Sequence, residues 1–307
     1  MNPAFSVVLF TTISGAAQGL LVALALAMLA GVPLAGGFVS AALILSEVML
    51  AVGLGASFAH LGRPERAWRA VLMWRTSWLS REVIALPAFM AVVALWWWLL
   101  RQGIDTPWLP VAVIVLAAVL WVCTGMIYAC LRFIQEWAQP LTLVNFALIG
   151  LSSGLILTSA LAAWAGEVPL LRVAGPAAVL LTLLALATRL LALRHNAQLK
   201  HKSDLHSATG IRTPKLVQKS MGMTGGSFNT REFFHGRTLA VLQQVKWALV
   251  VFGFVLPVLL ALWGLVSATT WPWLLAVLSQ VPGLLADRWF FFAQAKHPQN
   301  LYYQVVS

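Results

Sequence analysis

Two ionisable side chains flank one short polar connection in a chain that is otherwise strongly apolar. His60 follows one apolar block, and Glu82 begins the next one. An imidazole titrates near neutral pH and can give a proton to a carbonyl oxygen, while a carboxylate can relay protons to water. Ionisable groups at a membrane edge often mark functional sites, although a structural cap or a lipid headgroup contact is the alternative. The pair favours proton-coupled chemistry on a lipid-soluble substrate such as a quinone.

A second charged pair lies late in the chain, where Asp287 and Arg288 follow Pro282 by five and six residues. Two interpretations remain open for this pair. One is an intramembrane ion pair in which the long Arg288 side chain extends toward the interface. The other is a second wall of the site that holds His60 and Glu82, so that Asp287 and Arg288 also contribute to quinone binding.

The composition requires membrane-spanning helices to position these residues. The chain has 307 residues, of which 61% are hydrophobic and 9% charged, whereas a soluble domain carries about 25% charged residues. Apolar blocks of about 20 residues, long enough to cross a bilayer as helices, recur along the chain. Because helices satisfy their backbone polar groups inside lipid, the sequence predicts an all-α integral membrane protein, an eight-transmembrane-helix bundle. The predicted spans are 5–30, 34–59, 83–100, 108–131, 141–164, 174–193, 247–268 and 273–294.

The chain is predicted to form one membrane domain with a long polar insertion. Helices one to six occupy 1–194, a basic cytoplasmic loop covers 195–246, and helices seven and eight with the C-terminal tail cover 247–307. The loop is too short and too polar to build a hydrophobic core of its own.

The distribution of basic residues predicts the orientation of the bundle. Lys and Arg total 20 against 9 Asp and Glu, which gives a net charge of +11. With eight spans, nearly all of these basic residues share one side with both termini, and the opposite connections hold Arg101 and Arg172. The positive-inside rule then places both termini in the cytoplasm, with the bundle in a bacterial inner membrane, and no nucleic-acid partner is needed to explain the charge. The same topology puts Trp96, Trp137 and Trp273, among other tryptophans, in interfacial belts. The basic residues predicted to face the cytoplasm are Arg63, Arg66, Arg69, Arg75, Arg81, Arg132, Arg189, Arg194, Lys200, Lys202, Arg212, Lys215, Lys219, Arg231, Arg237, Lys246 and Lys296.

Motifs for other cofactors do not occur in the sequence. It has no Cys-x-x-Cys, no Cys-x-x-Cys-His, no Walker loop and no dinucleotide fingerprint, which predicts no metal site, no haem and no iron–sulfur cluster in this chain. Cys123 and Cys130 lie about 10 Å apart along one helix and are expected to be packing residues. A haem b cytochrome is one rival, with His297 as a second histidine near the same side. A secondary transporter is another, although its polar sites would lie at the midplane.

Three stretches of the sequence resemble a known family. They are HLGRPERAW at 60–68, WRTSWLSRE at 74–82 and DRWFFFAQAKHPQNLYY at 287–303. These stretches resemble the membrane-anchor subunits of dimethyl sulfoxide reductase-type molybdoenzymes. The NPAFS start, the second stretch and the basic loop look closest to the anchor of cytoplasm-facing, quinone-linked sulfite dehydrogenases. The resemblance covers essentially the whole chain, but the segment between His60 and Glu82 is richer in Arg than in the best-known members.

The resemblance implies that this chain is the quinone-reactive subunit of a heterotrimeric enzyme. One partner would carry Mo-bis-molybdopterin guanine dinucleotide and the other iron–sulfur clusters, both docked on the cytoplasmic face. His60 and Glu82 match the quinol-binding positions of the family. Arg63 and Arg81 are candidates for stabilising charge on the reduced quinone or for holding the iron–sulfur partner.

The inward-facing basic side favours the sulfite-oxidising branch of this family. Electrons from sulfite, oxidised to sulfate on a partner, would then pass to ubiquinone or menaquinone. The alternative is the anchor of a sulfoxide, polysulfide or tetrathionate reductase, because nothing in this chain touches the oxyanion and the substrate follows from analogy.

Overall fold

The computed structural model describes residues 1–59, 61–200, 202–213, 215–216 and 235–298, and the regular structure within them is helical. His60 therefore lies outside the described residues, as do the parts of the predicted basic loop at 201, 214 and 217–234 and the tail at 299–307. The helices of the first half are α1 (Phe5–Leu29), α2 (Gly36–Phe58), the 3-10 helix η1 (Pro64–Met73), α3 (Trp78–Arg101) and α4 (Trp108–Ala129).

The second half of the chain repeats the pattern of long helices. Two differ most from the predicted spans: α6 begins earlier and ends later than 174–193, and the seventh rod begins at Leu239 instead of 247. Helix therefore extends from both ends into the segment predicted as a loop. The elements are α5 (Pro140–Ala165), α6 (Val168–Gln198), the short α7 (Leu205–Thr209), α9 (Leu239–Val250), the π-helical η2 (Val251–Val255), α10 (Leu256–Ser267) and α11 (Trp271–Ala293).

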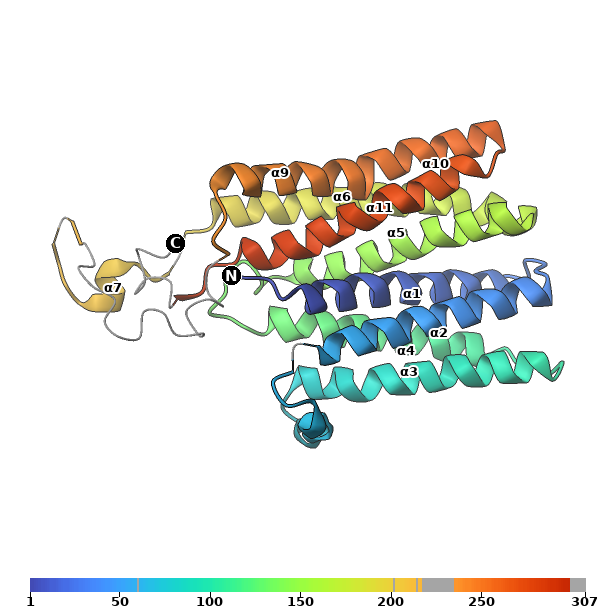
Figure 1. Cartoon of the computed structure of the whole chain (residues 1–307), viewed down its shortest axis with the longest axis horizontal. Coiled ribbons are helices and arrows are strands. Elements are labelled where there is room, and N and C mark those ends of the chain that lie inside the picture. Colours follow the sequence, from blue (N-terminus) through green and yellow to red (C-terminus); the bar gives the residue numbers. More distant parts are fainter. Residues whose placement is uncertain (60, 201, 214, 217–234, 299–307) are drawn as a thin grey trace.

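The long helices run side by side in an elongated bundle, and consecutive helices run in opposite directions (Figure 1). Seven of them are long and apolar enough to cross a membrane, counting α9, η2 and α10 as one rod from Leu239 to Ser267. α11 has 23 residues but is not among the seven. Its polar residues Gln280, Asp287 and Arg288 are all buried inside the bundle. The prediction of eight spans therefore still depends on whether α11 crosses the membrane.

Small residues bring α1 and α5 into close contact at the centre of the bundle. A Cβ atom added at Gly154 would overlap the backbone of Gly19 and Leu20, and one added at Gly19 would overlap Gly150. Glycines four residues apart on both helices, such as Gly150 and Gly154, form the close-packing surface that membrane helices use in place of hydrophobic burial. This contact fixes α1 against α5, and α1 carries the polar residues described below.

A π-helical segment interrupts the seventh rod where it crosses α11. Pro257 has no N–H to bond the carbonyl of Gly253, one helical turn earlier, and Gln280 of α11 donates to that carbonyl at 3.4 Å. Gly283 packs directly on the backbone of Phe252 and Gly253. The pairing of a freed carbonyl with a buried amide holds α11 against the rod and sets the register of the charged residues further along α11.

Three tryptophans predicted for the interfacial belts are buried inside the bundle, and their depth in a bilayer stays a prediction. The exposed fractions of Trp96, Trp137 and Trp273 are between 0% and 3%. Trp273 fills the space beside Gly264 and Gly175, and Trp137 donates its indole N–H to the carbonyl of Phe291 at 3.0 Å. Glycines thus make room for the Trp273 ring, and a backbone carbonyl accepts the indole N–H of Trp137.

An aromatic cluster joins several segments at one end of the bundle. Trp137 precedes α5, Phe146 lies in its second turn, Phe291 is near the end of α11, and Val8 is near the start of α1. The start of α1, the α4–α5 connection and the end of α11 therefore meet at one end. η1 lies at that same end (Figure 1). The cluster agrees with the grouping of connections that the charge pattern predicts, while the identity of the aqueous compartment stays a prediction.

Candidate functional site

The start of α3 positions Glu82 one turn inside the bundle. The Ser77 hydroxyl accepts the backbone N–H of Ser80 at 3.3 Å, which is the N-cap contact that defines the start of a helix. α2 ends at Phe58, two residues before His60. His60 itself lies outside the described residues, so the described part of the predicted pair is Glu82.

Glu82 points into the interior and has a polar partner there. Its exposed fraction is 5%, and its Oε1 accepts a hydrogen bond from the hydroxyl of Thr124 on α4. A carboxyl group buried among apolar side chains is costly unless it is hydrogen-bonded or protonated. Thr124 therefore supports Glu82 in either protonation state, because the hydroxyl can donate or accept.

The side chain of Arg81 does not enter the interior as that of its neighbour Glu82 does. Its guanidinium donates to the backbone carbonyls of Trp74 and Arg75 at 3.0 Å and 2.9 Å and stacks 4.2 Å from the centre of the Trp78 ring. These contacts attach the end of the η1 segment to α3. Arg63 is exposed at the start of η1. Arg63 thus lies in the connection between α2 and α3, and Arg81 lies in the first turn of α3 and bonds to that connection.

Asp287 forms a buried salt bridge with a residue that the sequence did not single out as its partner. The Arg189 Nε on α6 lies 2.5 Å from Asp287 Oδ1, and both side chains are almost completely buried. Arg189 also donates to the backbone carbonyl of Asp287 at 3.4 Å. This geometry corrects the first interpretation of Asp287 and Arg288: the ion pair connects α6 with α11, and Arg288 is buried instead of extending to the interface.

Arg288 separates two small cavities in the interior. Its guanidinium carbon lies 3.9 Å from the centre of the Phe146 ring, a cation–π contact. No described residue accepts a hydrogen bond from the guanidinium within normal distance. Arg288 lines both cavities.

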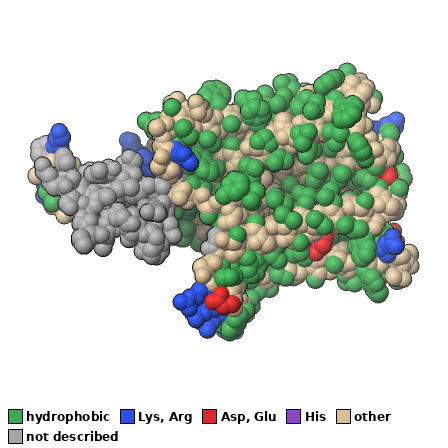
Figure 2. Space-filling model, viewed as in Figure 1, with side chains coloured by type: hydrophobic (Ala, Val, Ile, Leu, Met, Phe, Trp, Pro, Cys, Tyr) green, Lys and Arg blue, Asp and Glu red, His purple; other side chains and the backbone are tan. Residues whose placement is uncertain are grey.

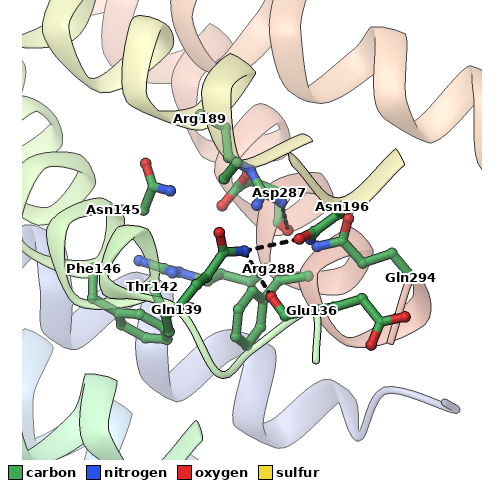
Figure 3. A pocket seen from close by; sticks show the side chains of 12 residues that line it. Glu136, Gln139, Thr142, Asn145, Phe146, Arg189, Asn196, Asp287, Arg288 and Gln294 are labelled. Carbon is green, nitrogen blue, oxygen red and sulfur yellow. Dashed lines mark hydrogen bonds and ion pairs between the residues drawn. The ribbon is translucent and has the colours of Figure 1, made fainter. Parts of the chain in front are cut away.

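The first cavity opens among α5, α6 and α11 (Figure 3). Gln139 donates to the side chain of Asn196 and to the carbonyl of Glu136, both at 2.8 Å. The amide nitrogens of Asn196 and Gln294 have no hydrogen-bond partner among the described residues. Buried polar groups without protein partners are normally satisfied by ordered water, and this cavity has room for about one water molecule.

The second cavity connects Arg288 with the partner of Glu82. Thr124 and Arg288 both line it. Three further polar atoms at this cavity, Ser14 Oγ, Gln18 Oε1 and Trp121 Nε1, have no partner in the described part of the chain. It also has room for about one water molecule. Thr124, which binds Glu82, and Arg288 thus border the same small polar space, and Arg288 also borders the first cavity.

These cavities can hold water and protons but not a quinone ring. Ligand pockets for such molecules have volumes of about 300–1,000 Å³, far above the space for one water. Within the described ranges, no three His, Cys, Asp or Glu side chains gather as metal ligands do. His297 packs edge-on against Phe133 with ring centroids 5.4 Å apart, and burial lowers the pKa of its imidazole.

Sequence reasoning found some of these residues and missed others. Glu82, Asp287 and Arg288 are rare charges in apolar spans, which makes them visible. Thr124 and Arg189 were not proposed as site residues, and neither were Ser14 and Gln18. The last two lie four residues apart in an apolar helix, a spacing that places both on one face, and this signal was available in the sequence.

Comparisons with known proteins agree with the architecture. The model of the family described as DMSO reductase anchor subunit (DmsC) matches residues 1–293. The chain is 49% identical to a sulfite dehydrogenase subunit of Allochromatium vinosum over 327 aligned positions that cover both chains completely. It is also 31% identical to the anaerobic dimethyl sulfoxide reductase chain YnfH of Escherichia coli over 119 residues, 37% of this chain and 41% of YnfH. The chain belongs to the DMSO reductase anchor subunit (DmsC) family, whose members are membrane anchors of oxidoreductase complexes.

Proposed function

We propose that this chain anchors a heterotrimeric molybdoenzyme in a bacterial inner membrane and passes electrons from sulfite oxidation to membrane quinone. On the partner subunits, sulfite and water would give sulfate, two protons and two electrons. At this subunit, quinone would take up two electrons and two protons to become quinol. The relation to a sulfite dehydrogenase subunit over the full length of both chains supports the choice of sulfite. The observation that supports proton-coupled quinone chemistry is the buried Glu82, whose partner Thr124 borders a small polar cavity.

His60 and Glu82 would divide the proton transfer between them. His60 hydrogen-bonds one quinone oxygen and gives it a proton, since an imidazole changes protonation state near neutral pH. Glu82 is 5% exposed and bound to Thr124, which suits a group that resupplies the proton from behind the quinone. Because the adjacent cavity holds about one water, the quinone ring would lie outside it, at the end of α2 next to His60.

Arg288 would stabilise negative charge that appears near Glu82 when the carboxyl group gives up its proton. Arg288 lines the cavity that Thr124 also lines, which supports this role. Asp287 is occupied by Arg189 and would fix α11 so that Arg288 stays in place. Arg81 and Arg63 would shape the connection that carries His60, and Arg63 is exposed and therefore accessible to the reduced quinone or to the iron–sulfur partner.

The molybdopterin and iron–sulfur subunits would dock at the end of the bundle that carries the aromatic cluster. The basic connections between helices belong to this end, and the positive-inside rule assigns it to the cytoplasm. Electrons then arrive on the same side as His60 and Glu82, so the distance from the last iron–sulfur cluster to quinone stays short. Protons would enter from the cytoplasm through the two cavities.

Replacing Glu82 by Gln tests this proposal. Gln keeps the size of the side chain and can accept the Thr124 hydroxyl, but it cannot release a proton. We expect sulfite-dependent quinone reduction by the complex to fall by about 10²- to 10⁴-fold, the usual contribution of a general acid or base. Sulfite oxidation with an artificial soluble acceptor should stay unchanged, because that reaction bypasses this subunit.

Glu47→Gln is the matched control, since Glu47 is another carboxylate within a predicted span and its Oε2 has no described hydrogen-bond partner. This variant should keep quinone reduction. His60→Ala should behave like Glu82→Gln. Normal quinone reduction in both His60→Ala and Glu82→Gln would remove the proposed site.

A second candidate function is the anchor of a sulfoxide-reducing complex. The partial match to the YnfH chain favours it, although that match covers 37% of this chain and the sulfite dehydrogenase subunit matches all of it. The two functions differ in the substrate of the partner. A complex purified through this subunit should oxidise sulfite; reduction of dimethyl sulfoxide by quinol without sulfite oxidation would favour the alternative.

A further inference from the structure

The η1 segment projects sideways from the bundle. In Figure 1 it is the coil between α2 and α3, seen nearly end-on beyond α3, so its axis runs across the direction of the long helices. No residue from Pro64 to Met73 is buried. This helix connects the end of α2 with the start of α3, the point where two spans reach the edge of the bundle. A helix that lies across the bundle axis at that edge occupies the depth of the headgroup layer.

Large apolar side chains of this segment and of the residue after it are mostly exposed. Trp68 and Leu72 are 63% and 65% exposed, and Met73 and Trp74 are 59% and 53% exposed. In water, such a group of neighbouring apolar side chains would be an unfavourable surface. In the interface of a bilayer, the same side chains enter the boundary between headgroups and acyl chains, where indole rings are especially favourable.

Basic side chains surround this apolar surface. Arg63, Arg66, Arg69 and Arg75 stand against a single acidic residue, Glu65. The guanidinium of Arg69 lies 5.6 Å from the Trp68 ring centre, and that of Arg75 lies 5.4 Å from the Trp74 ring centre. Figure 2 shows blue side chains, with a red one beside them, on the side of this projection that faces away from the long helices, and green side chains on its other side and at its tip. Arginines at the depth of the indoles would meet lipid phosphates, with which guanidinium forms strong paired hydrogen bonds.

We propose that η1 is an interfacial helix that inserts its Trp68 and Leu72 side into the inner leaflet and binds anionic phospholipid headgroups through its arginines. A lipid surface fits better than a protein partner for two reasons. The segment projects to the side, beyond α3, whereas a soluble subunit would cover the end of the bundle around the aromatic cluster. The charge excess also matches anionic lipid, whose attraction to such segments grows with each added Lys or Arg. This proposal does not depend on quinone chemistry.

Spin labels on the intact complex in vesicles of phosphatidylcholine and phosphatidylglycerol test the insertion. The labels would be placed at Leu72→Cys and Glu65→Cys in a background with Cys130→Ser, because Cys130 is exposed. Oxygen concentrates in lipid, while a water-soluble nickel chelate stays outside. We expect the label at position 72 to collide mainly with oxygen and the label at position 65 to collide more with nickel. Nickel collisions at both positions would overturn the proposal. So would protection of position 72 from both reagents, because that result indicates a protein partner.

Lipid selectivity tests the role of the arginines. In the same vesicles, spin-labelled phosphatidylglycerol should be enriched over phosphatidylcholine around the complex, and the enrichment should decrease in the double variant Arg66→Gln and Arg69→Gln. The matched control is Arg101→Gln with Arg172→Gln, at the other end of the bundle. An equal decrease in both double variants, or no decrease in the first, would contradict headgroup binding at η1. Quinone reduction measured on the same samples separates this proposal from the proposed function.

Discussion

Glu82 and Arg288 are buried ionisable residues on two different helices. Thr124 binds the carboxyl group directly and also lines the cavity that Arg288 borders. Asp287 next to Arg288 is bound by Arg189, so one arginine of this cluster has a carboxylate partner and the other faces the cavities. Burial makes each of these groups sensitive to the loss of its partner, because an unpaired charge in the interior is costly.

The substitution Asp287→Asn should destabilise the protein. The substitution leaves the Arg189 guanidinium buried without a counter-charge, and breaking a buried pair in this way costs about 3 kcal/mol or more. Unfolding in mixed detergent and dodecyl sulfate micelles measures the change. The double variant Asp287→Asn with Arg189→Met should recover part of the loss, because it removes the unpaired charge. Equal stability of Asp287→Asn and the unchanged protein would show that the pair carries no net stabilisation.

The sequence alone identified the charged residues of the site, but it did not show which of them form pairs. Charges at 82, 287 and 288 stand out because their surroundings are apolar. The partner of Asp287 could not be read from the sequence, since Arg189 is 98 positions away and the contact depends on the register of α6 against α11. Proximity along the chain favoured Arg288, which instead points toward Phe146 and the cavities.

The helices hold this site through close backbone contacts. α1 and α5 approach at Gly19 and Gly154, and α11 approaches the seventh rod at Gly253 and Gly283. Hydropathy predicted the existence of the rods and most of their bounds. It could not predict η2, because a π-helical segment is determined by a missing proline N–H and by the amide of Gln280 on another helix.

The substitution Gly154→Val should separate helix α1 from helix α5 and destabilise the bundle. The added side chain would overlap the Gly19 backbone, which cannot move aside as a flexible side chain would. The expected loss is about 3 kcal/mol, at the upper end of the range for overpacking. Gly55→Val on α2 is the control, because no atom lies within 4 Å of a Cβ at that position. Similar thermal stability of the two variants would contradict the close contact of α1 with α5.

The whole molecule is a bundle whose charged connections gather at one end. The structure supports the grouping of those connections, while their location in the cytoplasm comes from the charge pattern. Seven rods satisfy the requirements for a span by length and hydropathy, and α11 would complete an even number that returns the chain to the starting side. The polar residues of α11 lower its mean hydropathy, so hydropathy alone does not decide whether α11 spans the membrane. In the structure these polar residues face the interior of the bundle.

Labelling with a membrane-impermeant maleimide in intact cells tests this topology. In a Cys130→Ser background, Asp105→Cys between α3 and α4 should react from outside, and Lys202→Cys after α6 should react only after lysis. Both positions are exposed in the structure. Reaction of Lys202→Cys alone in intact cells would invert the orientation, and reaction of both variants would mean an even number of spans between them.

Sulfite-driven reduction of a quinone analogue by the complex isolated through a tag on this chain tests the central claim most directly. The tagged chain should bring molybdenum- and iron-containing partners with it in mild detergent, and added sulfite should reduce the quinone at a rate that Glu82→Gln lowers by about 10²-fold or more. If the isolated complex contains both metals and oxidises sulfite with a soluble acceptor, yet leaves the quinone oxidised, this chain is an anchor without the proposed electron transfer.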